Sequence, residues 1–188
     1  MQRREALGLV AVLVGGTIIG AEAFLTGCKT PARKTGLFAD SDIAFLDEVG
    51  ETILPATAAS PGAKAAQIGQ FMKVIVTDCY TPDDQNAFTA GIGKLNDASN
   101  KKFSKDFMDL SADQKHDLLV DLDKEAKDYG GTKKENDPNH YFTMMKQLTI
   151  WGYFTSEPGA TKALRYLAVP GHYDGNFPYK KGDKAWAT

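Results

Sequence analysis

The sequence predicts an all-α fold, a compact single-domain bundle of about five to six helices around a central apolar helix. Apolar residues recur at helical spacing in one segment after another, while the alternation typical of strands is absent after the N-terminal segment. Large apolar side chains lie on every side of a helical wheel drawn for Tyr141–Phe154, which predicts a buried central helix with Trp151 in the core. An irregular aromatic C-terminal tail, rich in turn residues from Val169 to Tyr179, is expected to pack over the domain's surface.

Four amphipathic helices are predicted before the central one, and each starts at a capping residue or a proline. Their expected extents are from Asp40 or Ser41, with Ser41 as the cap, to Pro55, from Ser60-Pro61 to about Cys79, from Thr81-Pro82 past Leu95, and from Ser111 to about Lys127. Asn100–Leu110 is predicted to be a connecting turn, and Tyr129–Asn139 a mobile surface loop. A shorter helix over Ala160–Tyr166 is expected to follow the central helix.

The N-terminal 28 residues have the pattern of a bacterial lipoprotein signal. An uncharged apolar run over residues 6–21 follows two arginines, and Leu25-Thr26-Gly27-Cys28 has the form of a lipobox in which Cys28 is lipidated. We therefore expect a signal peptide over residues 1–27, a flexible tether over 28–39, and a helical domain over 40–188. An uncleaved membrane anchor is the alternative, but the apolar run is shorter than the roughly 20 residues of a membrane span.

The paired arginines Arg3 and Arg4 predict the export route. Together with Leu7 they match the twin-arginine signal, whereas Ala6 stands where a phenylalanine is usual, so the general secretory route remains open. Either route leads to a lipid-anchored protein on the periplasmic side of a bacterial membrane. The sequence does not distinguish the inner from the outer membrane.

The composition limits what the mature chain can bind. The 188 residues carry a net charge of −2, and the 161 that follow residue 27 hold 20 basic and 22 acidic side chains. This balance does not suit a nucleic-acid surface. A domain of that size buries roughly 70% of its unfolded surface, so it needs neither metal nor disulfide to hold its fold.

No cofactor site is predicted in this chain. His116, His140 and His172 are far apart in the sequence and show no i, i+4 pair of the kind that binds zinc. Once Cys28 is lipidated, Cys79 alone cannot hold an iron–sulfur cluster. Cys79 is interpreted either as a buried small hydrophobe at a helix end or as half of an interchain disulfide.

The C-terminal tail has the richest side-chain chemistry in the mature chain. His172, Tyr173, Asp174, Phe177 and Tyr179 lie among turn glycines and are predicted to form a partner interface. The alternative is an active-site loop with His172 as a general base oriented by Asp174. A histidine and an acid two positions apart on a loop often occur by chance, which favours the interpretation as a partner interface.

The stretches WGYFTSEPGATKALRY (151–166) and VPGHYDGN (169–176) resemble the small subunit, or subunit 3, family of membrane-bound gluconate 2-dehydrogenase. Weaker resemblance extends back to about Ile43. The resemblance implies a non-catalytic subunit whose partner is a large flavin-dependent dehydrogenase subunit of the glucose–methanol–choline type. That partner would bind FAD, oxidise a sugar or sugar acid, and often pass electrons to a cytochrome c subunit.

Three classes of function follow, namely an accessory subunit of a redox enzyme, an independent enzyme, and a stand-alone periplasmic lipoprotein that serves as a binding or scaffold module. Twin-arginine export carries proteins that fold before crossing, commonly because a cofactor is inserted in the cytoplasm. A chain without a cofactor site gains little from that route alone. If this chain is exported while bound to a flavoprotein that lacks its own signal, the twin-arginine signal is explained. The accessory subunit is therefore the favoured hypothesis.

Overall fold

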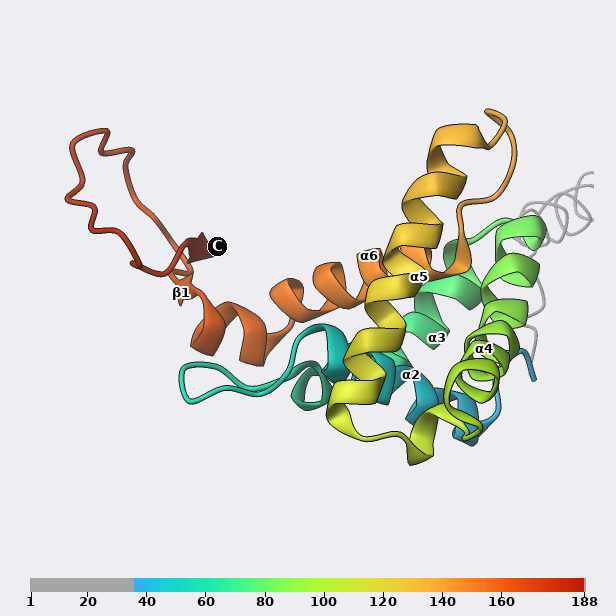
Figure 1. Cartoon of the computed structure of the whole chain (residues 1–188). Coiled ribbons are helices and arrows are strands. Elements are labelled where there is room, and N and C mark those ends of the chain that lie inside the picture. Colours follow the sequence, from blue (N-terminus) through green and yellow to red (C-terminus); the bar gives the residue numbers. More distant parts are fainter. Residues whose placement is uncertain (1–35, 188) are drawn as a thin grey trace, which may run out of the picture. The chain divides into compact units, whose positions relative to one another are not determined.

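The computed structural model describes residues 36–187, and the helical bundle predicted from the sequence is confirmed there (Figure 1). The predicted signal peptide, with Arg3, Arg4 and the lipidation site Cys28, lies outside the described residues, as does most of the tether. Within residues 36–187 the α-helices are α2 Asp40–Ile53, α3 Ile68–Cys79, α4 Pro82–Phe103, α5 Ala112–Thr132 and α6 Tyr141–Thr155. The shorter elements are the 3-10 turns η1 Ala63–Ala66 and η2 Phe107–Asp109, the π turn η3 Gly159–Ala163, and the strands β1 Arg165–Tyr166 and β2 Trp186–Ala187.

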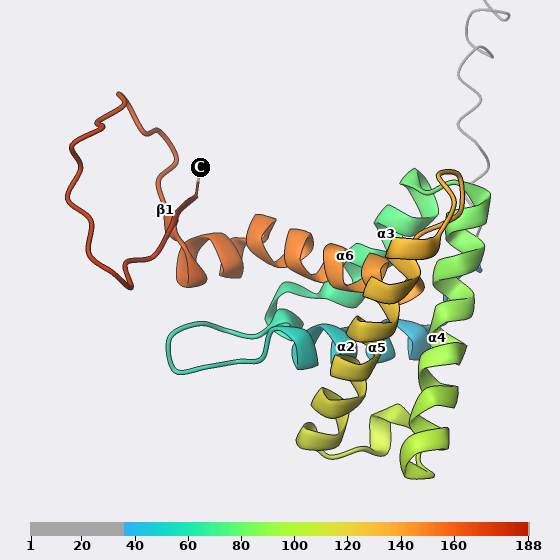
Figure 2. The ribbon, with the colours of Figure 1, turned by 45° about the horizontal axis from the view of Figure 1, so that its top comes forward.

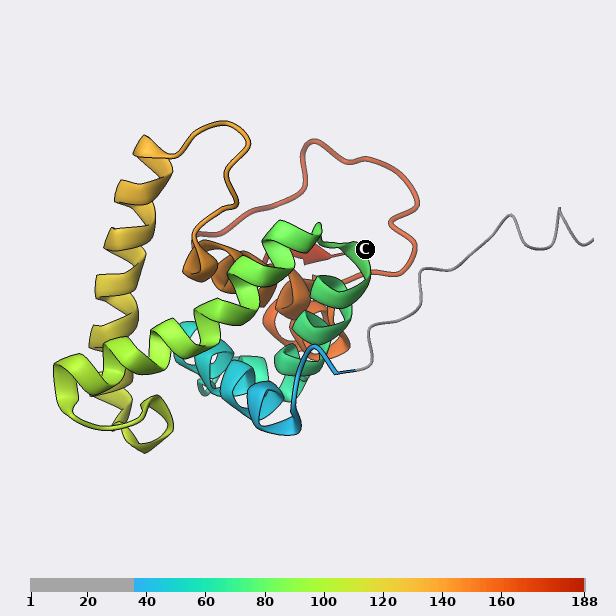
Figure 3. The ribbon, with the colours of Figure 1, turned by 90° about the vertical axis from the view of Figure 1, so that its right-hand side faces the viewer.

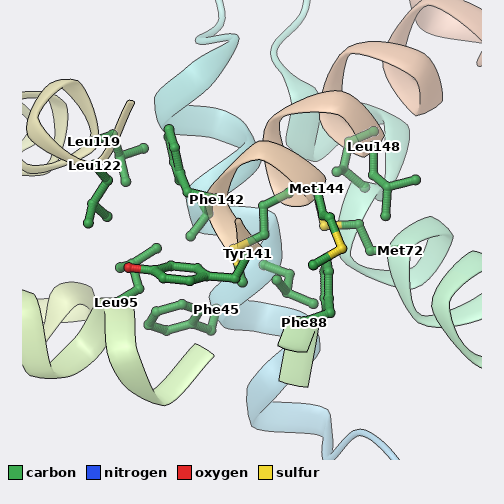
Figure 4. Close-up of a cluster of buried hydrophobic side chains, with 14 of the residues drawn as sticks. Phe45, Met72, Phe88, Leu95, Leu119, Leu122, Tyr141, Phe142, Met144 and Leu148 are labelled. Atoms are coloured by element: carbon green, nitrogen blue, oxygen red, sulfur yellow. The ribbon is translucent and has the colours of Figure 1, made fainter. Parts of the chain in front are cut away.

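Helix α6 is the central element of the bundle, as predicted. It contacts α2, α3, α4 and α5, and it extends beyond α4 and α5 toward the C-terminal segment (Figure 2). Figure 3 shows α4 and α5 diverging from the turn that contains η2. The side chains at the centre of the core come from all five helices: Phe45, Met72, Phe88, Leu95, Leu119, Leu122, Tyr141, Phe142, Met144 and Leu148 (Figure 4).

The prediction that α6 is buried all round, with Trp151 in the core, is wrong for its C-terminal half. Trp151 is 52% exposed, and Ile150 and Phe154 are 41% and 37% exposed. The reason lies in the lengths and positions of the neighbouring helices. Helix α4 contacts Tyr141, the first residue of α6. Asp123 of α5 forms an ion pair with Lys146 of α6. Beyond that point α3 packs against one side of α6, and the opposite side faces solvent.

Two helix starts depart from the sequence prediction. Ala39, not Ser41, is the N-cap of α2, because the Asp42 carboxylate accepts a hydrogen bond from the backbone N–H of Ala39 at 2.8 Å. The helix predicted from Ser60-Pro61 to Cys79 is divided in two by Gln67, whose backbone is left-handed (φ 52°). Only α3, after that break, is a regular helix.

Several helices also end at residues other than those predicted. Asn100–Phe103 continues α4, which ends at Ser104 in a left-handed conformation (φ 56°). Helix α5 runs through Gly130 and Gly131 to Thr132, so the following loop is shorter than expected. The helix predicted over Ala160–Tyr166 is a single π turn, after which the chain becomes extended.

Two predicted caps are confirmed. The hydroxyl of Thr81 accepts from the backbone N–H of Asp84 at 3.3 Å, with Pro82 in the first turn of α4. Ser111 and Gln114 form the predicted capping box of α5, with distances of 3.3 and 3.1 Å between side-chain oxygen and backbone nitrogen. Such caps are recognisable because every atom involved lies within one turn of sequence.

Two glycines of α4 provide a test of the contact between α4 and α6. A Cβ on Gly91 would lie 2.3 Å from the Cβ of Tyr141, an atom fixed to the backbone of α6, whereas a Cβ on Gly93 would meet nothing within 4 Å. We expect Gly91→Ala to lower the free energy of unfolding by about 1–3 kcal/mol. The matched variant Gly93→Ala should raise it by up to about 1 kcal/mol, because alanine favours helix. Urea denaturation measures the free energy of unfolding of both variants. Changes in the same direction would contradict the close contact between α4 and α6.

Candidate functional site

The segment after η3 forms a closed loop, which we call the C-terminal arm (residues 164–187). Its two ends pair as parallel strands, with Arg165 opposite Trp186 and Tyr166 opposite Ala187. The backbone N–H of Arg165 donates to the carbonyl of Ala185 at 2.8 Å, and that of Leu167 donates to Ala187 at 2.9 Å. The prediction of a tail packed over the domain's surface is therefore wrong. The arm closes on itself beyond the end of α6 (Figures 1 and 2).

Arg165 holds the two ends of the arm together. Its guanidinium carbon lies 4.4 Å from the centre of the Trp186 ring and 5.8 Å from that of Phe177, and Phe177 and Trp186 meet edge to face at 5.5 Å. A guanidinium nitrogen also lies 3.9 Å from the carboxylate of Asp183. Cation–π contacts of this kind stabilise by about 0.5–1 kcal/mol each at exposed sites. These contacts restrict the conformations of the arm, which lowers the entropy cost of binding a partner.

Four of the five predicted interface residues surround one hollow in the arm. His172, Tyr173, Asp174 and Phe177 line a space of about 580 Å³, together with Leu167, Pro170, Gly171 and Trp186. Tyr179 lies instead beside a second hollow of about 430 Å³, lined in part by Lys184 and Trp186. Tyr173 is 95% exposed and Tyr179 76% exposed, so both are available to a partner.

The geometry of the arm does not assemble the alternative active-site loop. The Asp174 carboxylate accepts a hydrogen bond from the backbone N–H of Asn176 at 2.9 Å, which closes a turn. Within the described part of the chain, no hydrogen bond joins Asp174 to the imidazole of His172. Asp174 therefore shapes the loop locally.

The arm and the helical bundle differ in charge. Residues 36–163 hold 13 basic and 20 acidic side chains, a net charge of −7, whereas the arm holds four basic and two acidic ones, a net charge of +2. A basic surface of this kind attracts acidic partners and speeds their association at low salt. The arm therefore combines exposed aromatic rings with a positive charge.

The ionisable groups inside the bundle have structural roles. Glu48 of α2 lies 2.7 Å from the ammonium of Lys115 on α5 and also pairs with Lys64 of η1. Burial by itself would raise the pKa of Glu48, but hydrogen bonds from the two lysines outweigh it and leave that pKa below its ordinary value. Burial raises the pKa of Tyr141 to about 12, and the charge of Glu125 adds to the effect. At neutral pH the charged Glu48 therefore ties α2 to α5 and η1, whereas Tyr141 is a neutral ring in the core.

The histidines do not come together. His140 caps α6, since its Nδ1 accepts from the backbone N–H of Phe142 at 3.3 Å, while His116 and His172 are exposed on other elements. Among residues 36–187 no group of three or more His, Cys, Asp or Glu side chains has the arrangement of a metal site. Cys79 is exposed at the end of α3, which overturns its interpretation as a buried hydrophobe. The interchain disulfide at Cys79 stays a prediction.

The family model for gluconate 2-dehydrogenase subunit 3 matches residues 40–171. The chain belongs to the gluconate 2-dehydrogenase subunit 3 family. Comparison with curated proteins and with solved structures gave no match. The matched region of this subunit 3 protein begins at the first residue of α2, includes all five described α-helices, and ends at Gly171 in the arm. The resemblance inferred from residues 151–176 is thereby confirmed.

Membership of the subunit 3 family identifies the chain as a member of a multi-subunit dehydrogenase complex, which is consistent with an accessory role. No helix in the described part of this subunit 3 chain has the length and apolar character to span a bilayer. The sequence prediction missed the contribution of Arg165, Asp183 and Trp186 to the arm. Arg165 and Trp186 are 21 positions apart, and no local pattern links them.

Proposed function

We propose that this chain is the non-catalytic small subunit of a membrane-associated, flavin-dependent sugar or sugar-acid dehydrogenase of the glucose–methanol–choline type. In this proposal it binds the large catalytic subunit, stabilises it, and accompanies it through the twin-arginine route. A lipid on Cys28 then anchors the complex on the periplasmic side of a bacterial membrane, with a cytochrome c subunit as a further partner. Family membership and the shape of the arm support the binding role, and the sequence of residues 1–28 supports export and anchoring.

The observation that carries the proposal is the exposed aromatic surface of the arm. At least half of each side chain is exposed for Tyr173, Phe177 and Tyr179. They lie on a loop whose ends are held together by Arg165 and Trp186. Aromatic side chains held rigidly at a surface are the residues that most often dominate protein–protein binding. Such a surface suits a protein whose role is to bind a partner.

The proposal assigns FAD to the large subunit. The hollow in the arm has aromatic walls and the carboxylate of Asp174, and a carboxylate would repel the diphosphate of FAD. The residues of this chain would therefore act by binding and positioning the partner.

Loss of the aromatic contacts should weaken the complex without unfolding the bundle. We expect the double variant Tyr173→Ala and Phe177→Ala to raise the Kd for the large subunit by about 30-fold or more, which corresponds to about 2 kcal/mol. The matched control is Met108→Ala, which removes an exposed apolar side chain outside the arm. Titration of the purified large subunit, followed by its flavin absorbance, gives both values. An unchanged Kd in the double variant would contradict the proposed interface.

A further inference from the structure

Three large apolar side chains on α6 are only partly covered in the structure. Ile150, Trp151 and Phe154 lie within one helical turn of each other on the exposed side of the helix, and we call them the α6 strip. Phe71 of α3 supports the strip from one side, with its ring edge-on to that of Trp151 at 5.3 Å. The strip is thus part of a rigid helix packed into the core, and it includes tryptophan, a residue type enriched among binding hot spots.

A basic groove adjoins the strip. It has a volume of about 330 Å³, lies between the end of α5 and α6, and shares Ile150 with the strip. Its lining includes Lys127, Lys133 and Lys146 but only one acidic residue, Asp123. Asp123 pairs with two of these lysines, at 2.9 and 2.5 Å, so the groove keeps an excess of two positive charges. This excess stands out in a bundle whose net charge is −7.

The strip and the groove form a single elongated surface along α6. Thr143 and Gln147 line the groove, and the same side of the helix continues through Ile150 and Trp151 to Phe154. From Thr143 to Phe154 the helix rises about 16 Å, which matches three turns of a second helix laid against it. Its apolar end leads through η3 to the arm (Figure 2).

We infer that this surface is a second docking site for the large dehydrogenase subunit. It would bind a segment of that subunit whose residues are apolar at one end and acidic at the other. The inference rests on the proposed function, because the same subunit would cover the arm and the adjoining α6 strip. The charge of the groove specifies the acidic part of the segment, and the strip specifies its apolar part. A second copy of this chain fits less well, since a two-fold dimer through this face would place each basic groove opposite either the other groove or the apolar strip, and neither supplies acidic residues to pair with it.

Site-specific cross-linking in the full-length chain tests where the large subunit lies. Three variants carry p-benzoylphenylalanine in place of Gln147 in the docking surface, Tyr173 in the arm, or Asp97 on the exposed side of α4 as a control. Cells that make both subunits are irradiated, and the cross-linked peptides are identified by mass spectrometry. We expect positions 147 and 173 to cross-link to the large subunit and position 97 to give no such product. The peptide joined to position 147 should contain both apolar and acidic residues.

The outcomes separate this inference from the proposed function. Cross-links to the large subunit from position 173 but not from position 147 would refute the second docking site and leave the proposed function intact. Position 147 joined to a second copy of this chain, to lipid, or to a segment without acidic residues would also refute it. If neither position cross-links to the large subunit, the inference and the proposed function are both wrong.

Binding measurements test the two parts of the surface separately. Lys127 lines the groove and Lys124 does not, although both are on α5 and their side chains are 73% and 71% exposed. We expect Lys127→Glu to raise the Kd for the large subunit by about tenfold at low salt, with a smaller effect at high salt, and Lys124→Glu to change it less than about twofold. Trp151→Ser should raise the Kd by about 30-fold. Equal effects of the two lysine variants, or an unchanged Kd for Trp151→Ser, would overturn the inference.

Discussion

Replacing Phe142 by alanine is expected to lower the free energy of unfolding by about 3–5 kcal/mol, which is a large part of the 5–15 kcal/mol typical of a domain. Phe142 is buried on α6 and belongs to the cluster formed with Leu119 and Leu122 of α5 and with Phe45 of α2 (Figure 4). The alanine variant would lose the apolar surface of the ring and leave a cavity where several helices meet. Urea denaturation followed by circular dichroism measures the change.

Trp151→Ala is the matched control on the same helix. Tryptophan is the larger residue, but half of its surface already faces solvent and Phe71 is its aromatic neighbour. Because little apolar surface would be newly exposed, we expect a loss of no more than about 1.5 kcal/mol. A loss for Trp151→Ala as large as that for Phe142→Ala would show that the exposed side of α6 is assigned wrongly.

Replacing Arg3 and Arg4 by lysine is expected to strand two proteins in the cytoplasm at once. Lysine keeps the positive charge but lacks the planar guanidinium fork that the twin-arginine translocase would recognise. Under the escort mechanism the large subunit has no signal of its own, so it should remain in the cytoplasm, folded and with flavin bound. We expect dehydrogenase activity to disappear from the periplasmic fraction and to persist in the cytoplasmic fraction.

The variant with Tyr173→Ala and Phe177→Ala is the control for this experiment, because it should leave export of the small subunit intact while weakening its hold on the partner. Cytoplasmic and periplasmic activity are measured for both variants and for the wild-type protein. Dehydrogenase activity outside the cytoplasm that is unchanged by the double lysine variant would rule out the escort mechanism. The chain would then act after export, or as a stand-alone lipoprotein.

The helices could be predicted from the sequence where their signals are local. Thr81 and Ser111 cap α4 and α5 through atoms within one turn, so reading four consecutive residues suffices. The apolar content of Tyr141–Phe154 likewise identified α6 as the central helix. The family could be inferred from residues 151–176 for the same reason, since a motif is a local property of the chain.

The break at Gln67 shows where local signals fail. The apolar stripe from Ala65 to Ile75 has helical spacing throughout, and nothing in it indicates a left-handed residue. Packing next to the break explains the bend. A Cβ on Gly69 would lie 2.2 Å from the carbonyl oxygen of Ile43, so α3 must approach α2 very closely there. The Asp47 carboxylate also accepts from the backbone N–H of Gly69 at 2.7 Å, which helps fix the start of α3.

The sequence by itself determined where the helices α2 to α6 of this protein lie, although not all of their ends, which helix is central, and which residues of the C-terminal segment are candidates for binding. Only the tertiary structure decided that Trp151 is exposed and that the C-terminal segment is a closed arm. Hydrophobicity shows that a side chain favours burial, but not whether a neighbouring helix is long enough to cover it. The arm depends on contacts between Arg165 and Trp186, which are brought together by the path of the chain and not by any periodic pattern. Residues that a pattern assigns to the core can therefore lie at the surface.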